Sequence, residues 1–307
     1  MTTIQNQNFG VEIELTGITR ATAAGVIAEY FGGTVRHIGT AYDTYGATDR
    51  KGRTWKAMSD ASITTVKKID GQRVPAGREY SCEVVTPILQ YEDIDDLQNI
   101  VRALVAKGAI TNSSCGIHVH VDGANHTPQS LTRLMNFAIG RQDLFYEALQ
   151  IEDRANHWCR KMSRKLLNAM KSDKQMTKST LEHIWYSSVN DDYTGGINHE
   201  HYNSTRYHGI NLHAFFTKGT VEFRLFNGTT HAGKIKAYVQ FCLAMSAWAI
   251  GADDNMYYKS CASYTKEQKG QLMLGVLTRR LKMTGPEFKT ARLHLTSAFS
   301  NTTEEAA

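Results

Sequence analysis

The sequence predicts an α+β protein in which strands with charged residues alternate with amphipathic helices. Residues 9–15 and 219–225 each place charges two positions apart between apolar residues, the period of a strand with one polar face. Residues 19–31 and 91–106 instead carry apolar residues at helical spacing, and glycine follows each of them. These two periods in one chain of 307 residues predict a sheet covered by helices.

The remaining elements follow from turn residues and apolar spacing. Between residues 34 and 85, short apolar segments are separated by turns rich in Asp, Gly and Arg, which predicts strands. Thr127-Pro128 is a helix-start signal. In chain order we expect strands at 35–45, 54–58, 62–67 and 79–85, a helical region at 127–170, a hairpin of strands at 207–216 and 220–226 turning at 217–219, and helices at 232–250 and 265–281.

The chain is predicted to form a single domain, residues 1–307. It contains four prolines, and no Ser-, Gly- or charge-rich spacer interrupts the pattern of elements. Residues 127–186 are interpreted as a helical insertion. Residues 187–205 are polar without clear periodicity, and a segment of this length in a compact protein is either a lid or disordered.

Composition favours a reduced, cytoplasmic protein. The first ten residues are polar and lack the charged and apolar regions of a secretory signal. Five cysteines occur with no CxxC pair, which fits reduced thiols better than disulfides or a zinc ribbon. The longest apolar stretch, residues 238–250, is too short to cross a bilayer and is expected to be a buried helix, so no membrane partner is predicted.

The formal net charge of +5 is modest for this length, and much of it lies between residues 154 and 178. Neither aromatic interleaving nor a helix-turn-helix pattern accompanies these basic residues. A solvated helix face is therefore favoured over a nucleic-acid patch. Nucleic acid is neither required nor excluded as a partner, and the oligomeric state is left open.

Four glutamates in strand-like segments predict a metal site. Glu12 and Glu14 share one face of the first strand, where two like charges repel unless a cation lies between them. Glu83 lies near the end of a later strand, and Glu222 lies in residues 219–225. One such pair alone usually marks an exposed sheet face. The four acids together favour Mg²⁺, or Mn²⁺, because carboxylate oxygens suit these hard cations.

His118 and His120 share a strand face, two and four residues after Gly116. Such a pair can bind zinc, donate to a phosphate, or pack in place. Beside the acids, we expect one imidazole to touch a metal ion or phosphate and the other to hold the shape of the site. Neither GxxxxGK[ST] nor GxGxxG occurs, so metal ions and cationic side chains are expected to hold phosphates.

Two arginines are candidates to bind phosphate or carboxylate groups, which a guanidinium holds bidentately. Arg224 shares a strand face with Glu222, so this acid either binds a metal or orients the arginine. The other candidate is Arg206. On a regular strand, the side chains of Asn211 and Arg206 would point to opposite faces of the sheet. A bulge at Gly209 would place them on the same face.

The charged motifs of this sequence, taken in their order along the chain, resemble those of the amidoligase family. This family is related to glutamine synthetase and glutamate-cysteine ligase. The resemblance implies a curved, mainly antiparallel sheet in a half-barrel, the glutamine synthetase-like catalytic fold, with ATP and Mg²⁺ on its concave face. It runs from about residue 10 to residue 229. The motifs that carry it are Glu12-x-Glu14, Trp55 with Asp60-x-Ser62, Glu83-x-x-Thr86-Pro87, Gly116-Ile117-His118-Val119-His120, Arg206 with Asn211, and Glu222-Phe223-Arg224.

The resemblance implies an ATP-dependent carboxylate-amine ligase that forms an amide through an acyl phosphate. Its substrates would be a small-molecule or peptide carboxylate and an amine, whose proton Asp60 could accept. The implied roles are metal ligands for Glu12, Glu14, Glu83 and Glu222; nucleotide contacts for Glu83, His118, His120, Asn211 and Ser62; and catalysis for Arg206, Arg224 and Asp60.

Two other interpretations stay open. His118 and His120 with one glutamate could form the site of a metal-dependent hydrolase or oxygenase. Tightly bound zinc or iron would indicate this class of enzyme. The chain could also be an inactive binding module of the same fold, which would fail to bind nucleotide. The sequence does not identify the carboxylate or the amine.

Overall fold

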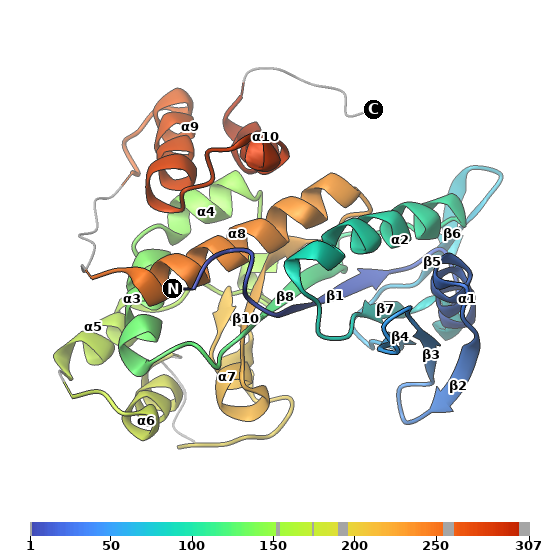
Figure 1. Ribbon diagram of the computed structural model, residues 1–307, viewed down its shortest axis with the longest axis horizontal. Coiled ribbons are helices and arrows are strands. Elements are labelled where there is room, and N and C mark those ends of the chain that lie inside the picture. The colour runs from blue at the N-terminus through green and yellow to red at the C-terminus, as the bar shows by residue number, and fades with distance from the viewer. Residues whose placement is uncertain (1, 152–153, 174, 190–195, 254–260, 301–307) are drawn as a thin grey trace. The chain divides into compact units, whose positions relative to one another are not determined.

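The computed structural model describes residues 2–151, 154–173, 175–189, 196–253 and 261–300 (Figure 1). Two compact units make up the chain. The N-terminal unit comprises Gln5–His120 and Phe226–Tyr238, and the C-terminal unit comprises Met1–Ile4, Val121–Leu225 and Val239–Ala307. This division does not test the prediction of a single catalytic domain, which stays a prediction.

The described residues form an α+β protein, as predicted. The strands are β1 (Phe9–Leu15), β2 (Val35–Gly39), β3 (Thr44–Thr48), β4 (Thr54–Met58), β5 (Val66–Ile69), β6 (Gln72–Pro75), β7 (Cys82–Val85), β8 (Gly116–Asp122), β9 (Ile210–Asn211) and β10 (Thr220–Asn227). The helices are α1 (Arg20–Phe31), α2 (Ile94–Ala106), α3 (Pro128–Ile139), α4 (Gln142–Ala148), α5 (Arg164–Ser172), α6 (Lys178–Ser188), α7 (His213–Lys218), α8 (Ala232–Gly251), α9 (Lys266–Gly275) and α10 (Lys289–Thr296).

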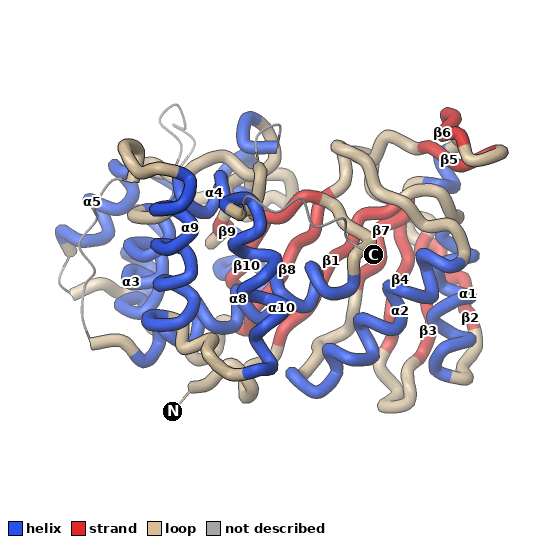
Figure 2. The backbone as a smooth tube through the Cα atoms, turned by 90° about the horizontal axis from the view of Figure 1, so that it is seen from above, coloured by secondary structure: helices blue, strands red, loops and turns tan. Residues whose placement is uncertain are grey.

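The N-terminal unit contains an open, mainly antiparallel sheet in the order β2-β3-β4-β7-β1-β8 (Figure 2). Helix α1 packs against β3 and β4, and α2 packs against α1. The register of β1 and β7 places Glu14 opposite Glu83. The period-two pattern of β1 is confirmed, because Val11, Ile13 and Leu15 are buried in the core. The glutamine synthetase-like half-barrel stays a prediction.

Strand β2 forms one edge of this sheet. Its pairing with β3 shifts register between His37 and Gly39, and residues 35–38 are exposed. The prediction of one strand over 35–45 is therefore wrong. Thr40 and Asp43, both with positive φ, lie in the turn that separates β2 from β3.

The predicted strand at 62–67 starts only at Val66. The preceding residues form a turn in which the backbone N–H of Ser62 donates to Asp60 Oδ1 at 2.7 Å. A side chain that accepts from its own backbone two residues later stabilises a turn against a strand. Asp60 and Ser62 consequently lie in a loop after β4.

The predicted hairpin at 207–216 and 220–226 is also wrong. Strand β9 contains only Ile210–Asn211, and α7 follows it. Asn211 Oδ1 accepts from the N–H of His213 at 2.8 Å, which satisfies a donor in the first turn of α7. Gly219 ends the helix in the left-handed region with φ 75°. Strand β10 is confirmed and pairs antiparallel with β9.

The C-terminal unit is mostly helical, and the region predicted as one long helical stretch contains α3, α4 and α5. Arg133 Nε of α3 donates to the carbonyl of Ala249 at 2.9 Å, tying α3 to the end of α8. The predicted helix at 265–281 is α9, followed by a five-residue π-helical segment, Val276–Arg280. Of the predicted lid, residues 190–195 lie outside the described residues, and the lid stays a prediction.

Three further expectations from the sequence concern the cysteines, the basic stretch and membrane spans. Each of the five cysteines is buried and free of a disulfide, as expected for reduced thiols. Most of the described basic residues at 154–178 are exposed, as expected of a solvated face, but Arg154 is buried. Among the helices of the described residues, none combines the length and the apolar character that a membrane span requires.

We expect buried histidines to make the fold acid-sensitive between about pH 6.5 and pH 4. Burial, with some repulsion from Arg133, lowers the pKa of His126 to about 4 from its ordinary 6.5. As pH falls, the unfolded chain takes up the proton first, so the free energy of unfolding decreases by about 1.4 kcal/mol per pH unit for one such group. This contribution is fully present above pH 6.5 and is lost by about pH 4.

The measurement is urea denaturation of wild type and His126→Gln across this pH range. The variant should show a shallower pH dependence, while its stability at pH 7 falls because the ring lies 2.9 Å from both Ser130 Oγ and Ser246 Oγ. His183→Gln, at an exposed position on α6, serves as the control and should keep the wild-type slope. An unchanged slope in His126→Gln would contradict the assignment.

Candidate active site

Three buried side chains of the N-terminal unit converge on one point. Glu14 of β1, Glu83 of β7 and His118 of β8 each offer a ligand atom, and these atoms lie within 4.8 Å of one another. The exposed fractions of these three residues are 3%, 8% and 3%. Like charges directly opposite on paired strands repel, and burial makes the repulsion more costly. This acid cluster, Glu14 with Glu83 and His118, is therefore a candidate metal centre.

Glu12 lies beside the acid cluster and contacts both predicted histidines. His118 Nδ1 is 3.0 Å from Glu12 Oε2, and His120 Nε2 is 3.1 Å from Glu12 Oε1. Burial alone would raise the pKa of Glu12, but the charge of His120 and the hydrogen bonds from both rings hold this pKa well below its usual range. The carboxylate is consequently ionised, and it fixes the orientation of both imidazoles.

The donor set fits a hard divalent cation. The His118 ring joins the two glutamates of β1, since its Nε2 lies 3.8 Å from Glu14 Oε1. Glu14 Oε2 accepts from the backbone N–H of Gly116 at 2.5 Å, which orients this carboxylate. Carboxylate oxygens outnumber imidazole nitrogens, the pattern that Mg²⁺ and Mn²⁺ prefer. A zinc site would more commonly be rich in imidazole or thiolate.

The turn that carries Asp60 and Ser62 is attached to the start of β7. Ser81 Oγ donates to the carbonyl of Asp60 at 2.6 Å, and the N–H of Asp60 lies 3.0 Å from the same oxygen. Arg20, the first residue of α1, donates to the carbonyls of Ser81 and Arg78 at 2.8 and 2.7 Å. These contacts fix the chain two residues before Glu83. Arg20 is a supporting residue that the sequence analysis missed.

A second group, in the C-terminal unit, surrounds Glu222. Its Oε1 accepts from an Arg224 guanidinium nitrogen, and its Oε2 accepts from Asn211 Nδ2, both at 2.5 Å. The register of β9 and β10 places Asn211 opposite Glu222. All three residues are at most 4% exposed. Of the two roles left open for Glu222, these contacts support orientation of Arg224.

Arg206 belongs to the same unit but lies at the end of a 3₁₀ turn, Ser204–Arg206. Its guanidinium donates to the carbonyl of His201 at 2.8 Å and lies 5.7 Å from the centre of the Tyr207 ring. The Arg224 guanidinium lies 5.8 Å from the same ring. Tyr207 therefore joins the two predicted arginines. The sequence analysis missed it, although a tyrosine directly after Arg206 was the available signal.

The predicted site residues thus form two sets. Glu12, Glu14, Glu83, His118 and His120 meet in the N-terminal unit, where the loop of Asp60 and Ser62 is held against the start of β7. Arg206, Asn211, Glu222 and Arg224 belong to the C-terminal unit. The individual roles assigned to these residues stay predictions.

Buried carboxylates with histidines on an antiparallel sheet are typical of an enzyme site, and comparison with known families gives the class. The model of the family described as "Putative amidoligase enzyme" matches residues 5–246. The chain belongs to this family, which confirms the resemblance and makes the protein a ligase that forms amide bonds. Among the curated proteins, no relative matches the chain.

Proposed function

We propose that the protein is an ATP-dependent carboxylate-amine ligase that works with Mg²⁺, or Mn²⁺, through an acyl phosphate. The observation that carries the proposal is the acid cluster, in which Glu14 and Glu83 are buried opposite each other beside His118. Such a cluster suits a cation that also binds phosphate oxygens. When bound, this cation would neutralise charge on the nucleotide phosphates.

The proposed reaction has two steps that balance. A carboxylate oxygen of the first substrate bonds to the γ-phosphorus of ATP, and ADP leaves. The amine nitrogen of the second substrate then bonds to the carbonyl carbon, inorganic phosphate leaves, and the amine loses a proton. Phosphoryl transfer needs positioning and charge stabilisation more than a protein nucleophile, which matches the side chains present.

The residues of this chain take the following proposed roles. Glu12, Glu14 and Glu83 hold the cation, while Glu12 also keeps His118 and His120 oriented toward nucleotide phosphate. Glu222 holds the guanidinium of Arg224 in place for the acyl phosphate, with Arg206 in the same role. We also propose that Asp60 accepts the proton of the amine and that Ser62 and Asn211 contact the nucleotide.

Trapping of the acyl phosphate tests this proposal. Hydroxylamine converts an acyl phosphate to a hydroxamate even when the natural amine is unknown. With ATP and Mg²⁺, a panel of carboxylates that begins with amino acids and continues with peptides should include one that gives ADP and hydroxamate in equal amounts. Glu14→Gln should abolish both products, whereas Glu29→Gln, at an exposed position on α1, should not.

The possible outcomes separate the alternatives. AMP with pyrophosphate would indicate an adenylating ligase and contradict the acyl phosphate. ADP without hydroxamate would indicate a kinase or uncoupled hydrolysis. Tightly held zinc or iron together with hydrolytic activity would favour the histidine-based enzyme, and failure to bind Mg-ATP would favour the inactive binding module.

A further inference from the structure

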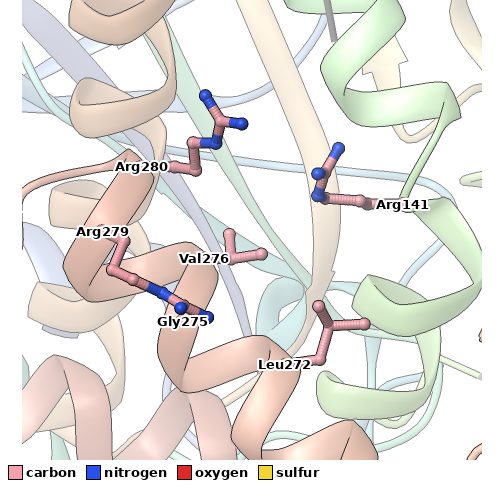
Figure 3. Close-up of a pocket in the computed structure, with 6 residues that line it drawn as sticks. All are labelled: Arg141, Leu272, Gly275, Val276, Arg279 and Arg280. Atoms are coloured by element: carbon pink, nitrogen blue, oxygen red, sulfur yellow. The ribbon is translucent and has the colours of Figure 1, made fainter. Parts of the chain in front are cut away.

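A pocket of about 410 Å³ in the C-terminal unit is lined by three arginines. Arg141 follows α3, and the other lining residues come from α9 and the π-helical segment after it (Figure 3). This volume is typical of a site for a small molecule. The lining residues are Arg141, Leu272, Gly275, Val276, Arg279 and Arg280. Five of these six residues lie beyond the family match, which ends at residue 246.

The positive charges at this pocket oppose one another. Burial, together with the charge of Arg280, lowers the pKa of Arg141 to about 10. The Arg141 guanidinium is held 5.0 Å from the centre of the Phe137 ring. An anion beside Arg141 would offset both the lost hydration and the repulsion from Arg280. The acids of the adjacent helix α4 are paired with lysines, Asp143 with Lys161 at 2.6 Å and Glu147 with Lys269 at 2.7 Å.

The backbone of the π-helical segment Val276–Arg280 determines where Arg279 and Arg280 lie. π-Helical turns are rare and occur frequently at functional sites. At Gly275, a Cβ atom would lie 2.5 Å from an Arg279 guanidinium nitrogen, so the absence of a side chain lets this guanidinium lie across the helix (Figure 3). Leu272 and Val276 add an apolar wall to the pocket.

We propose that this pocket binds a small oxyanion with several negative charges, carried by phosphate or carboxylate groups. Planar guanidinium groups bind both kinds of group through paired hydrogen bonds. The pocket uses none of the residues assigned to the ligase reaction, so the proposal stands or falls independently of the proposed function.

The test uses inorganic pyrophosphate and citrate as probes on the full chain, with EDTA present and at low ionic strength. Hydrogen exchange should slow at the backbone amides of residues 272–280 when either probe binds. A response to pyrophosphate alone identifies phosphate as the ligand chemistry, and a response to citrate alone identifies carboxylate. If neither probe slows exchange at about 10 mM, the affinity of the pocket is too weak for a specific binding site, and the proposal is wrong.

Variants establish where the probe binds. Arg141→Gln should weaken probe binding about tenfold, because it removes a charge-assisted contact. Gly275→Ala should weaken it as well by displacing the Arg279 guanidinium, with little change to the pocket's net charge. Arg73→Gln makes the same charge change at an exposed position on β6 and should bind normally.

An equal loss in Arg141→Gln and Arg73→Gln would show unspecific attraction and overturn the site, as would normal binding in both pocket variants. Glu14→Gln should keep the slowed exchange while losing hydroxamate formation, which separates the pocket from the ligase reaction. If Arg141→Gln does not fold, probe binding by Gly275→Ala alone tests whether the pocket is the binding site.

Discussion

Glu14→Gln should lower the rate of carboxylate-dependent ADP release by on the order of 10² or more, while the free energy of unfolding should stay constant or rise. The rate falls because the cation loses a ligand and the transferring phosphoryl group loses counter-charge. Stability does not fall because the substitution removes repulsion between Glu14 and Glu83, which are paired across β1 and β7. The amide oxygen of glutamine can still accept from the N–H of Gly116.

The measurements are steady-state turnover with Mg²⁺ and thermal melting in EDTA. A rise in melting temperature together with lost turnover is the signature of a metal ligand, since a purely structural glutamate would lose stability as well. Glu29→Gln is the matched control, with the same change of charge at an exposed site in the same unit. Wild-type turnover in Glu14→Gln would remove the metal assignment.

Arg224→Lys should lower turnover by about 10² to 10³ while changing ATP affinity much less. The ammonium group keeps the charge but cannot reproduce the bond to Glu222 at 2.5 Å and the bond to the Trp158 carbonyl at 3.3 Å together with a bidentate contact to phosphate. Because Glu222 is buried, some stability is lost too, so turnover is compared at a temperature where the variant is folded.

Single-turnover rates and nucleotide binding, measured separately, check this prediction. Arg36→Lys, on exposed strand β2, provides the control. Equal losses in ATP binding and turnover would place Arg224 on the ground-state phosphates instead of the acyl phosphate. Arg206→Lys, at the second proposed contact to the acyl phosphate, should follow the same pattern.

Local patterns predicted much of the N-terminal unit. Glu12 and Glu14 alternate with core residues, so the face of β1 could be assigned from its own sequence. The register could not, because the pairing of Glu14 with Glu83 depends on strands separated by a long stretch of chain. The acids could therefore be named as a group, but the sequence did not show which two oppose each other.

The errors occurred where side chains bond to nearby backbone. Residues 212–216 have the apolar and aromatic composition of a strand, yet Asn211 and Gly219 delimit helix α7. Both signals were present in the sequence, and capping outweighed composition. Arg20 gave no comparable signal, because it donates to the Ser81 carbonyl 61 residues further along the chain. Contacts of this kind follow only from the assembled fold.

The outermost strand β2 has a consequence for how this protein behaves in crowded solution. An unpaired sheet edge is a template on which another molecule can add a strand, and long flat edges lead to fibres. This edge is five residues long, its register is interrupted before Gly39, and it presents Arg36 and His37 to solvent. His37 lies 2.8 Å from Asp43 of the following turn. A neighbouring chain would meet a short, kinked border in which Arg36 and His37 lie between the exposed apolar residues Val35 and Ile38, so the short length and the interrupted register limit growth of the sheet through this side.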